Sequence, residues 1–202
     1  MTIRAIIFDL GGVLLRTADF SLREKLASKY GLSRAELEEL IFYGYSGGGV
    51  QRGEISLEEH WKNVGLRLNC SPEELEKLIR EFFAEDRLDN DLLNYIRQLH
   101  EKYKTALLSN AASNLRTQIA EKWHFEDAFD VMVISGEIGM LKPEVGIFVH
   151  VVEQLCVEAG EAVFVDDARE NVEGARKAGL SAIHFHSPQQ ARAELERLLT
   201  AG

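Results

Sequence analysis

The sequence has few cysteines, few prolines and no long hydrophobic run. Its 202 residues include only two cysteines, Cys70 and Cys156, which lie far apart and show no metal-ligand spacing. Reduced thiols in the cytoplasm are therefore a better interpretation than a disulfide. No apolar stretch approaches the ~20 residues that cross a bilayer, and the chain enters its first apolar run without a signal peptide. We expect a cytoplasmic protein with no membrane partner.

Basic residues are also scarce relative to acidic ones. The sequence has 23 Lys and Arg against 33 Asp and Glu, which gives a formal net charge of −10. Nucleic acids and anionic membranes are polyanions, so neither is an expected partner. A small anionic substrate remains compatible, because it responds to the local field and to any bound metal. The length fits one domain, or one domain with a modest insertion.

The stretch at residues 4–13 (RAIIFDLGGV) organises the rest of the chain. Its apolar run ends abruptly in Asp9, which a pair of glycines, Gly11 and Gly12, follows closely. A continuous apolar run bounded by a turn signal is typical of a strand buried on both faces. Asp9 would then lie at the carboxyl end of that strand, where open α/β sheets bind ligands. This stretch alone leaves two interpretations of Asp9 open, a turn-capping aspartate and a nucleophile.

Residues 16–87 show helical periodicity and no strand pattern. Serine followed three residues later by glutamate is a helix-start signal, and it occurs four times in this segment. The four pairs are Ser21/Glu24, Ser33/Glu36, Ser56/Glu59 and Ser71/Glu74. We therefore predict a module of four short helices.

Residues 44–53 interrupt this helical module with five glycines in ten residues. Such a composition predicts a mobile loop rather than a regular element. No strand precedes it and no Gly-Lys-Ser/Thr follows it, so a hinge or substrate-facing loop is favoured over a phosphate-binding loop. Tyr43, Tyr45 and Arg52 in and beside it are candidates to face a substrate, although such helical surfaces more often simply pack together.

From residue 88 onward, helical and strand patterns alternate. Apolar strands are expected at 105–108, 129–134, 162–165 and 181–185, with helices between them. This alternation predicts a parallel sheet with helices on both faces. The predicted fold class is α/β and Rossmann-like, with a core domain formed by residues 1–15 and 88–202. Residues 16–87 are the predicted helical cap domain, inserted after the first strand.

Three of the predicted strands end in polar residues, which are Asp9, the pair Ser109-Asn110 and the pair Asp166-Asp167. The carboxyl ends of parallel strands share one edge of the sheet, so these residues should converge. Four segments, FDLGGV at 8–13, LSN at 108–110, LKPE at 141–144 and FVDD at 164–167, resemble motifs one to four of the haloacid dehalogenase (HAD) superfamily, in order. The helical insertion lies where subfamily I of that superfamily carries its small cap. The opening motif is similar to that of the glucose-1-phosphate phosphatase-like branch.

The resemblance implies a magnesium-dependent phosphatase that works through an aspartyl-phosphate. Asp9 would be the nucleophile, and a cation is needed because carboxylate and phosphate repel each other. Mg²⁺ prefers hard oxygen ligands. The implied ligands are Asp9, the backbone carbonyl of Gly11, Asp166 and Asp167, with Asp167 favoured as the more direct of the last two.

The resemblance also assigns the remaining site residues. Ser109 and the backbone or amide of Asn110 would hydrogen-bond the phosphoryl oxygens of the substrate. Lys142 would place positive charge on the transferring group and on Asp9. Asn171 would orient Lys142 or the metal's surroundings, or else make an early-helix bond. The histidines have no paired nucleophile and are interpreted as structural.

Gly11 is the point at which the sequence departs from the family pattern. Phosphatases of the superfamily usually carry there a second aspartate, which protonates the leaving group and then activates water. General acid–base catalysis is typically worth about 10²–10⁴-fold, so its loss should matter. The substrate could have a good leaving group, as an anomeric sugar phosphate or an acyl phosphate does. Alternatively, another group or a metal-bound water replaces the acid, or turnover has been lost.

The leading hypothesis is a phosphatase that hydrolyses a small phosphorylated metabolite, such as a sugar phosphate, as a monomer or homodimer. One alternative is a metal-independent 2-haloacid dehalogenase, an enzyme class that also lacks the second aspartate. Such enzymes usually carry an aromatic residue there and need no acid pair like Asp166-Asp167, so phosphate is favoured over halide. A second alternative is a non-catalytic module that binds phosphate esters.

Overall fold

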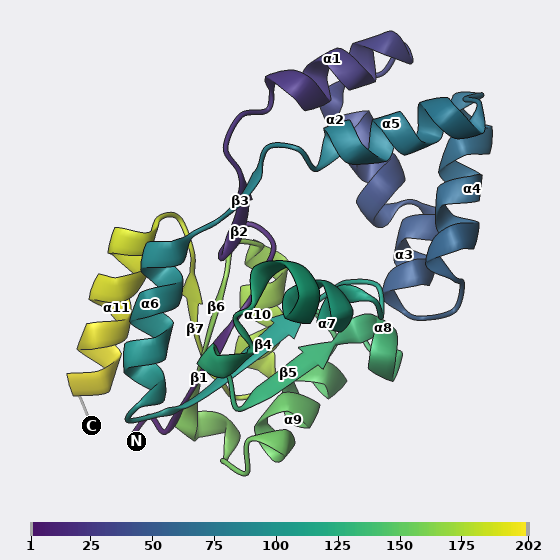
Figure 1. The fold of residues 1–202 in the computed structure, drawn as a ribbon. Helices are drawn as coiled ribbons and strands as arrows, with labels where there is room; N and C mark the ends of the chain where they lie inside the picture. The colour runs from purple at the N-terminus through teal and green to yellow at the C-terminus, as the bar shows by residue number, and fades with distance from the viewer. Residues whose placement is uncertain (1, 201–202) are drawn as a thin grey trace.

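The computed structural model describes residues 2–200, apart from the side chain of Tyr45. Five parallel strands form one sheet in the order β5-β4-β1-β6-β7 (Figure 1). Their bounds are β1 Ala5–Phe8, β4 Lys104–Ser109, β5 Val131–Ile134, β6 Ala162–Asp166 and β7 Ser181–His184. The predicted α/β, Rossmann-like parallel sheet is thus confirmed.

The central strands are buried along their whole length. Every residue of β1 and of β6 is inaccessible to solvent, as expected for parallel strands that helices cover on both faces. β1 lies between β4 and β6, and Phe8 at its end pairs with Leu107 and with Val165. This register brings the residues that follow the three strands to one edge of the sheet.

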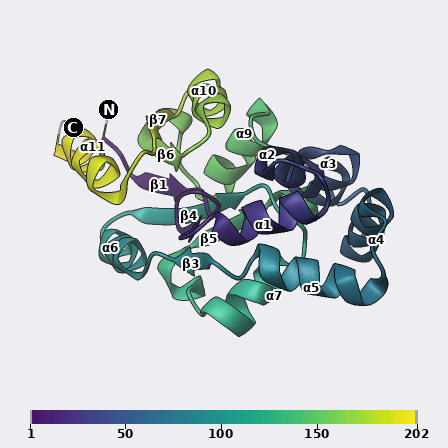
Figure 2. The same ribbon diagram turned by 90° about the horizontal axis from the view of Figure 1, so that it is seen from above.

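Helices cover both faces of this sheet (Figure 2). Helices α6 and α11 pack on one face through apolar residues such as Leu92 and Leu195, whereas α9 and α10 pack on the other through residues such as Phe148 and Ala175. The core helices are α6 Asn90–His100, α7 Leu115–Gln118 with its π-helical continuation η2 Ile119–Trp123, the 3₁₀ turns η3 Glu126–Ala128 and η4 Ala159–Glu161, α8 Ser135–Ile138, α9 Val145–Gln154, α10 Arg169–Lys177 and α11 Pro188–Thr200.

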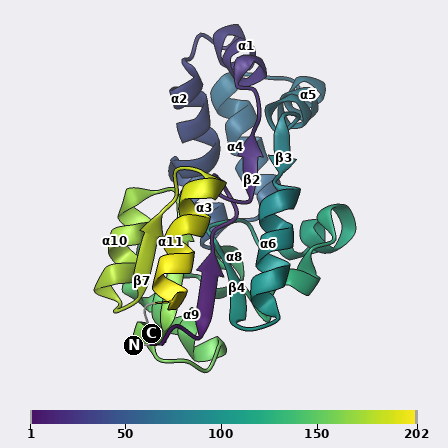
Figure 3. The ribbon, with the colours of Figure 1, turned by 90° about the vertical axis from the view of Figure 1, so that its left-hand side faces the viewer.

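The helices between Ser21 and Phe82 form a separate group, which we call the helical group. Its elements are α1 Ser21–Lys29, α2 Arg34–Glu38, the π-helix η1 Glu39–Tyr43, α3 Tyr45–Gln51, α4 Leu57–Leu68 and α5 Pro72–Phe82. It has an apolar cluster of its own, in which Leu37, Val64 and Leu78 are buried. Figure 3 shows the helical group above the end of the sheet toward which β1 points.

Two short antiparallel strands, β2 Leu15–Thr17 and β3 Asp86–Leu88, connect the helical group to the core (Figure 1). The sequence gives no strand pattern here, because three residues are too few to show a period. Ala18 N also donates a hydrogen bond to the Glu85 carbonyl, which extends this two-stranded connection toward the helical group.

Three of the four predicted helix-start signals cap a helix. Ser33 and Ser71 form complete capping boxes, and Ser56 accepts a hydrogen bond from the backbone three residues later. A helix does begin at Ser21, but the predicted cap by its side chain is wrong. The carboxylate of Asp19 instead accepts a hydrogen bond from Ser21 N at this helix start. The signal therefore locates the helices well but misses a competing acceptor two residues upstream.

The prediction of a mobile loop at residues 44–53 is also wrong, since most of this segment is helix α3. Its glycines permit close packing. A Cβ at Gly47 would lie 2.6 Å from the carbonyl carbon of Phe42, and a Cβ at Gly53, where φ is +70°, would lie 2.5 Å from the Gly136 carbonyl oxygen. The second of these contacts joins the helical group to the core.

We expect Gly47→Ala to destabilise the protein and Gly48→Ala to stabilise it slightly. Both glycines lie in α3, where alanine is normally favoured over glycine by about 0.5–1 kcal/mol. A Cβ at Gly48 meets its nearest atom, the Tyr43 carbonyl oxygen, at an ordinary 3.6 Å, whereas a Cβ at Gly47 collides with backbone. Thermal unfolding of the two variants measures the difference. Equal melting temperatures would contradict the close packing at Gly47.

Within residues 2–200, no helix combines the length and the apolar character that crossing a lipid bilayer requires.

Candidate active site

Three aspartates meet at the carboxyl edge of the sheet. Asp9 follows β1, Asp166 ends β6, and Asp167 comes next in the chain. One carboxylate oxygen of each lies within 4.8 Å of the others. Asp9 and Asp166 are buried, whereas Asp167 is exposed. The predicted convergence of these strand ends is therefore present in the fold.

Lys142 supplies positive charge to this cluster. Its Nζ atom lies 2.7 Å from Asp9 Oδ1 and 2.7 Å from Asp166 Oδ2. The lysine itself is only 4% exposed. Because it contacts two carboxylates at once, its ammonium is fixed in position between the ends of β1 and β6.

One lysine does not balance three carboxylates. Burial raises the pKa of Asp9 to about 8 against the opposing effect of Lys142, and the charge of Asp166 adds to the increase. Burial, followed by the charge of Asp166, also raises the pKa of Asp167. Burial opposes the charge of Lys142, but Asp9 and Asp166 outweigh it and raise the pKa of the lysine. The cluster thus carries excess negative potential, and its oxygen donors fit a hard divalent cation such as Mg²⁺.

Asp166 is held more firmly than Asp167. Its Oδ1 accepts a hydrogen bond of 2.8 Å from Ala168 N, and Asn171 Nδ2 lies 3.1 Å from both of its oxygens. Together with Lys142, these contacts occupy both carboxylate oxygens. Two roles were open for Asn171, orienting Lys142 or the metal's surroundings, and making an early-helix bond. The contacts favour the first, because Asn171 holds Asp166, which in turn contacts Lys142.

The Asn110 side chain holds the loop that carries Lys142. Asn110 Nδ2 donates to the Lys142 carbonyl, and Lys142 N donates to Asn110 Oδ1, both at 2.9 Å. The Lys142–Pro143 peptide bond in this loop is cis. The Asn110 amide is occupied by these bonds, so contact with a phosphoryl oxygen stays a prediction for its backbone N–H alone.

Ser109 ends β4 beside Asp9. Its side chain is largely buried, yet its hydroxyl forms no hydrogen bond to any protein group within residues 2–200. A hydroxyl at this edge without a protein partner remains available to a ligand. The predicted contact with substrate is therefore compatible with the geometry.

The two glycines after Asp9 differ in what they allow. A Cβ at Gly12, where φ is +77°, would lie 2.0 Å from Asp167 Oδ2, so glycine is required there by both space and backbone conformation. A Cβ at Gly11 would meet no atom within 4 Å. The absence of a side chain at Gly11 is therefore not imposed by packing. The predicted role of its carbonyl as a metal ligand remains a prediction.

A histidine at this edge supports the backbone of Asp167. His184 ends β7, the strand next to β6, and its Nε2 lies 2.8 Å from the backbone carbonyl of Asp167. With Nε2 protonated, the ring donates to that carbonyl and holds the Asp167 backbone in place. This contact agrees with the interpretation of the histidine as structural.

The residues proposed to face a substrate from the helical group have different surroundings. The Arg52 guanidinium forms an ion pair with Glu144, two residues beyond Lys142, and so joins α3 to the core. Tyr43 is 68% exposed at the end of η1. The Tyr45 side chain lies outside the described part of the structure.

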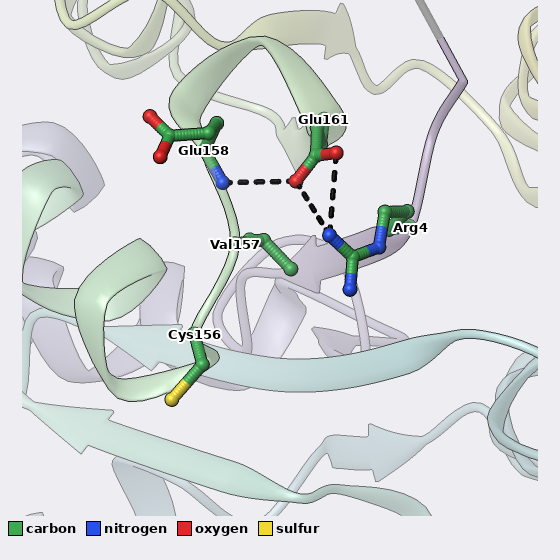
Figure 4. Close-up of a pocket in the computed structure, with 5 residues that line it drawn as sticks. All are labelled: Arg4, Cys156, Val157, Glu158 and Glu161. Atoms are coloured by element: carbon green, nitrogen blue, oxygen red, sulfur yellow. Dashed lines mark hydrogen bonds and ion pairs between the residues drawn. The ribbon is translucent and has the colours of Figure 1, made fainter.

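Two surface hollows lie at the opposite, amino edge of the sheet. The smaller, of about 240 Å³, is lined by Arg4, Cys156, Val157, Glu158 and Glu161 (Figure 4). The Glu161 carboxylate accepts hydrogen bonds there from the Arg4 guanidinium and from Glu158 N. The larger, of about 550 Å³, also contains Arg4. Because they lie at the edge of the sheet opposite the aspartate cluster, we do not assign the active site to these hollows.

Comparison with curated proteins gives full-length matches to phosphatases. The chain is 26% identical over 199 residues to the sesquiterpene phosphatase astK of Aspergillus oryzae, covering 98% of this chain and 97% of that protein. It is also 26% identical over 199 residues to a phosphorylated carbohydrates phosphatase of Thermotoga maritima, covering 95% and 90%. A match to the drimenol cyclase drtB of Aspergillus calidoustus, 25% identical over 206 residues and 97% of this chain, spans only 36% of that longer protein.

Solved structures share the fold. A HAD family enzyme from Bacteroides thetaiotaomicron, in complex with magnesium and inorganic phosphate, superposes with a TM-score of 0.76 at 24% identity and covers 91% of this chain and 94% of its own. An L-2-haloacid dehalogenase from Xanthobacter autotrophicus gives 0.64 at 20% identity, covering 90% and 76%. The fold alone therefore does not distinguish phosphatase chemistry from dehalogenase chemistry. The model of the haloacid dehalogenase-like hydrolases matches residues 3–179, and the chain therefore belongs to this hydrolase family.

Proposed function

We propose that this protein is a Mg²⁺-dependent phosphomonoesterase that acts on a small phosphorylated metabolite in the cytoplasm, as a monomer or homodimer. The observation that carries the proposal is the cluster of Asp9, Asp166 and Asp167 around the buried ammonium of Lys142. A dehalogenase needs no acid-rich site of this kind. Two full-length relatives are named as phosphatases, and the Bacteroides enzyme was solved with magnesium and phosphate, which also supports the proposal.

The metal would be held by the carboxylates of Asp9, Asp166 and Asp167, with the Gly11 carbonyl as a further ligand. Asp167 is favoured as the more direct ligand of the acid pair, because both oxygens of Asp166 already accept bonds from Lys142, Ala168 or Asn171. Bound Mg²⁺ would reduce the repulsion between the nucleophile and the phosphate and polarise a phosphoryl oxygen.

Asp9 would attack the phosphorus atom of the substrate in line. A bond forms from its carboxylate oxygen to phosphorus, and the bond from phosphorus to the leaving oxygen breaks, which gives an aspartyl-phosphate. Lys142 holds its ammonium 2.7 Å from Asp9 Oδ1 and stabilises the negative charge of the transferring group. Ser109 would donate a hydrogen bond to a phosphoryl oxygen. Attack of water on phosphorus then releases phosphate and restores the Asp9 carboxylate.

Assay of a panel of sugar, nucleotide and acyl phosphates, with and without EDTA, tests the proposal. We expect phosphate release that requires Mg²⁺ and returns when the metal is added back after EDTA. Metal-independent phosphate release would contradict the mechanism. If no compound in the panel releases phosphate but a phosphate ester binds measurably, the non-catalytic binding module would instead be favoured. Halide release from 2-chloropropionate without metal would favour the dehalogenase.

Gly11→Asp is expected to accelerate the hydrolysis of phosphate esters with poor leaving groups, such as simple alkyl phosphates. The new carboxyl group would lie two residues after Asp9, in space that the structure leaves open. Protonation of the leaving alkoxide should raise kcat about 10²-fold. An anomeric sugar phosphate should gain less, because its leaving group needs less protonation. Gly11→Asn, which is similar in size but not an acid, is the control. Equal effects of the two substitutions on alkyl phosphates would contradict the missing-acid explanation.

A further inference from the structure

The end of helix α3 docks on the core beside α8 (Figure 1). Arg52, the residue that follows α3, forms an ion pair with Glu144. The next residue, Gly53, approaches α8 so closely that a Cβ on it would lie 2.5 Å from the Gly136 carbonyl oxygen. We call these two contacts together the α3 contact. Within residues 2–200, no other ion pair joins the helical group to the sheet or to the helices that cover it.

Glu144, the core partner in this ion pair, closes the turn that carries Lys142. Its Oε1 atom contacts Arg52 and its Oε2 atom lies 3.5 Å from Leu141 N, so one carboxylate bridges the helical group and the turn. The Glu144 backbone N–H also donates a hydrogen bond of 2.9 Å to the Leu141 carbonyl. Lys142 lies inside this turn, and a displacement of Glu144 would therefore move the Lys142 backbone.

The Gly136 half of the α3 contact leads to the same lysine by a second route. Gly136 N donates a hydrogen bond of 3.0 Å to the Ala111 carbonyl. Ala111 follows Asn110, whose side chain forms two hydrogen bonds of 2.9 Å with the Lys142 backbone. Both halves of the α3 contact therefore rest on segments that hold Lys142 in place.

We infer that Arg52 is a positioning residue, which through Glu144 couples the docking of the helical group to the position of the Lys142 ammonium. With α3 docked, the turn at 141–144 is supported and the ammonium is held 2.7 Å from Asp9. Without the ion pair, the turn opens more often and holds the ammonium less firmly. The kinetic consequence of this coupling rests on the proposed function, whereas its structural part requires no turnover.

Hydrogen exchange of the Lys142 backbone N–H, followed by NMR on the intact protein, tests the coupling without a substrate. This N–H donates to Asn110 Oδ1, so its exchange rate reports how often the turn opens. Arg52→Gln should accelerate the exchange about threefold, as expected for the loss of one partly exposed ion pair. Arg52→Glu places two carboxylates together and should accelerate it about tenfold. The His186 N–H, which donates to the Gln190 side chain, should exchange at an unaltered rate.

Two further variants separate the charge of Arg52 from a general effect on the fold. Reversal of both charges, Arg52→Glu combined with Glu144→Arg, restores the attraction and should return the exchange rate of the Lys142 N–H to within about threefold of the unaltered protein. Arg97→Gln is the matched control, because Arg97 pairs with Asp127 inside the core and its side chain is 36% exposed, against 35% for Arg52. This control should leave the exchange of the Lys142 N–H unaltered.

Steady-state kinetics on a phosphate ester that the protein hydrolyses measure the consequence for the site. Arg52→Glu should lower kcat about tenfold and leave KM within about threefold, because Lys142 acts on the transferring group. The double charge reversal should recover most of the lost kcat.

Equal exchange of the Lys142 N–H in Arg52→Glu and in the unaltered protein, or no recovery on double charge reversal, would overturn the inference. Equal acceleration at the His186 N–H would also overturn it, because Arg52 would then support the whole fold rather than the turn. If the exchange responds as expected but no ester is hydrolysed, the coupling stands and the proposed function fails. If esters are hydrolysed and the exchange does not respond, the proposed function stands and the coupling fails.

Discussion

Asp9→Asn is expected to abolish turnover while leaving the protein folded. The amide cannot form the covalent phosphate intermediate, so kcat should fall by at least about 10⁴-fold. Asp9 lies within 4.8 Å of two further carboxylates, and burial raises its pKa to about 8. Because burial beside two like charges disfavours the ionised form of Asp9, and Lys142 keeps Asp166 as a partner, a neutral amide at this position should leave thermal stability unchanged or slightly higher. Phosphate release and the melting temperature, measured on the same preparation, check both expectations.

Asp91→Asn is the matched control for Asp9→Asn. Asp91 is an exposed residue of α6, and the same chemical change there should leave phosphate release unaltered. Retention of a substantial fraction of turnover by Asp9→Asn would refute the nucleophilic role of Asp9. Loss of turnover accompanied by unfolding would point to a structural role instead.

Lys142→Met is expected to impair both stability and catalysis. The substitution keeps most of the side-chain volume but leaves Asp9 and Asp166 buried without their shared cation. Loss of one partner from a buried ion pair costs about 3–5 kcal/mol of unfolding free energy. Loss of a preorganised charge at the transferring group should also lower kcat about 10²–10³-fold. Denaturant unfolding and steady-state kinetics measure the two effects.

A comparison of Lys142→Met in Mg²⁺ and in EDTA tests whether unbalanced negative charge causes its loss of stability. A cation bound by Asp9, Asp166 and Asp167 would offset part of the unbalanced charge, so the loss of stability should be smaller in Mg²⁺ than in EDTA. Lys102→Met, at an exposed position beside the hollow of about 550 Å³, is the control and should change neither quantity. An unfolding free energy for Lys142→Met equal to that of the unaltered protein would contradict the role of the lysine in the cluster.

The convergence at the sheet edge could be predicted because each signal is local. Apolar runs ending at Asp9, Ser109 and Asp166 identify buried strands, and the alternation with helices makes those strands parallel. The carboxyl ends of parallel strands share one edge of the sheet, so the residues at these ends are expected to lie close together. The sequence could place these side chains at one edge but could not give their hydrogen-bond partners.

The missing parts depend on contacts between residues distant in the chain. The Asn110 amide binds the backbone of Lys142, 32 positions later, and His184 binds the carbonyl of Asp167 across neighbouring strands. A Cβ at Gly53 would collide with the carbonyl oxygen of Gly136 in the core, so a glycine in a segment whose composition is typical of a loop is required here by a distant contact. Local patterns do not contain these tertiary contacts.

Detection of the covalent intermediate tests the central claim most directly. After rapid acid quenching of the protein with Mg²⁺ and a turned-over phosphate ester, mass spectrometry of its peptides should find phosphate on the peptide that contains Asp9. EDTA or the Asp9→Asn substitution should remove this signal. Sustained turnover with no phosphate on Asp9, or with phosphate on another residue, would contradict the proposed mechanism.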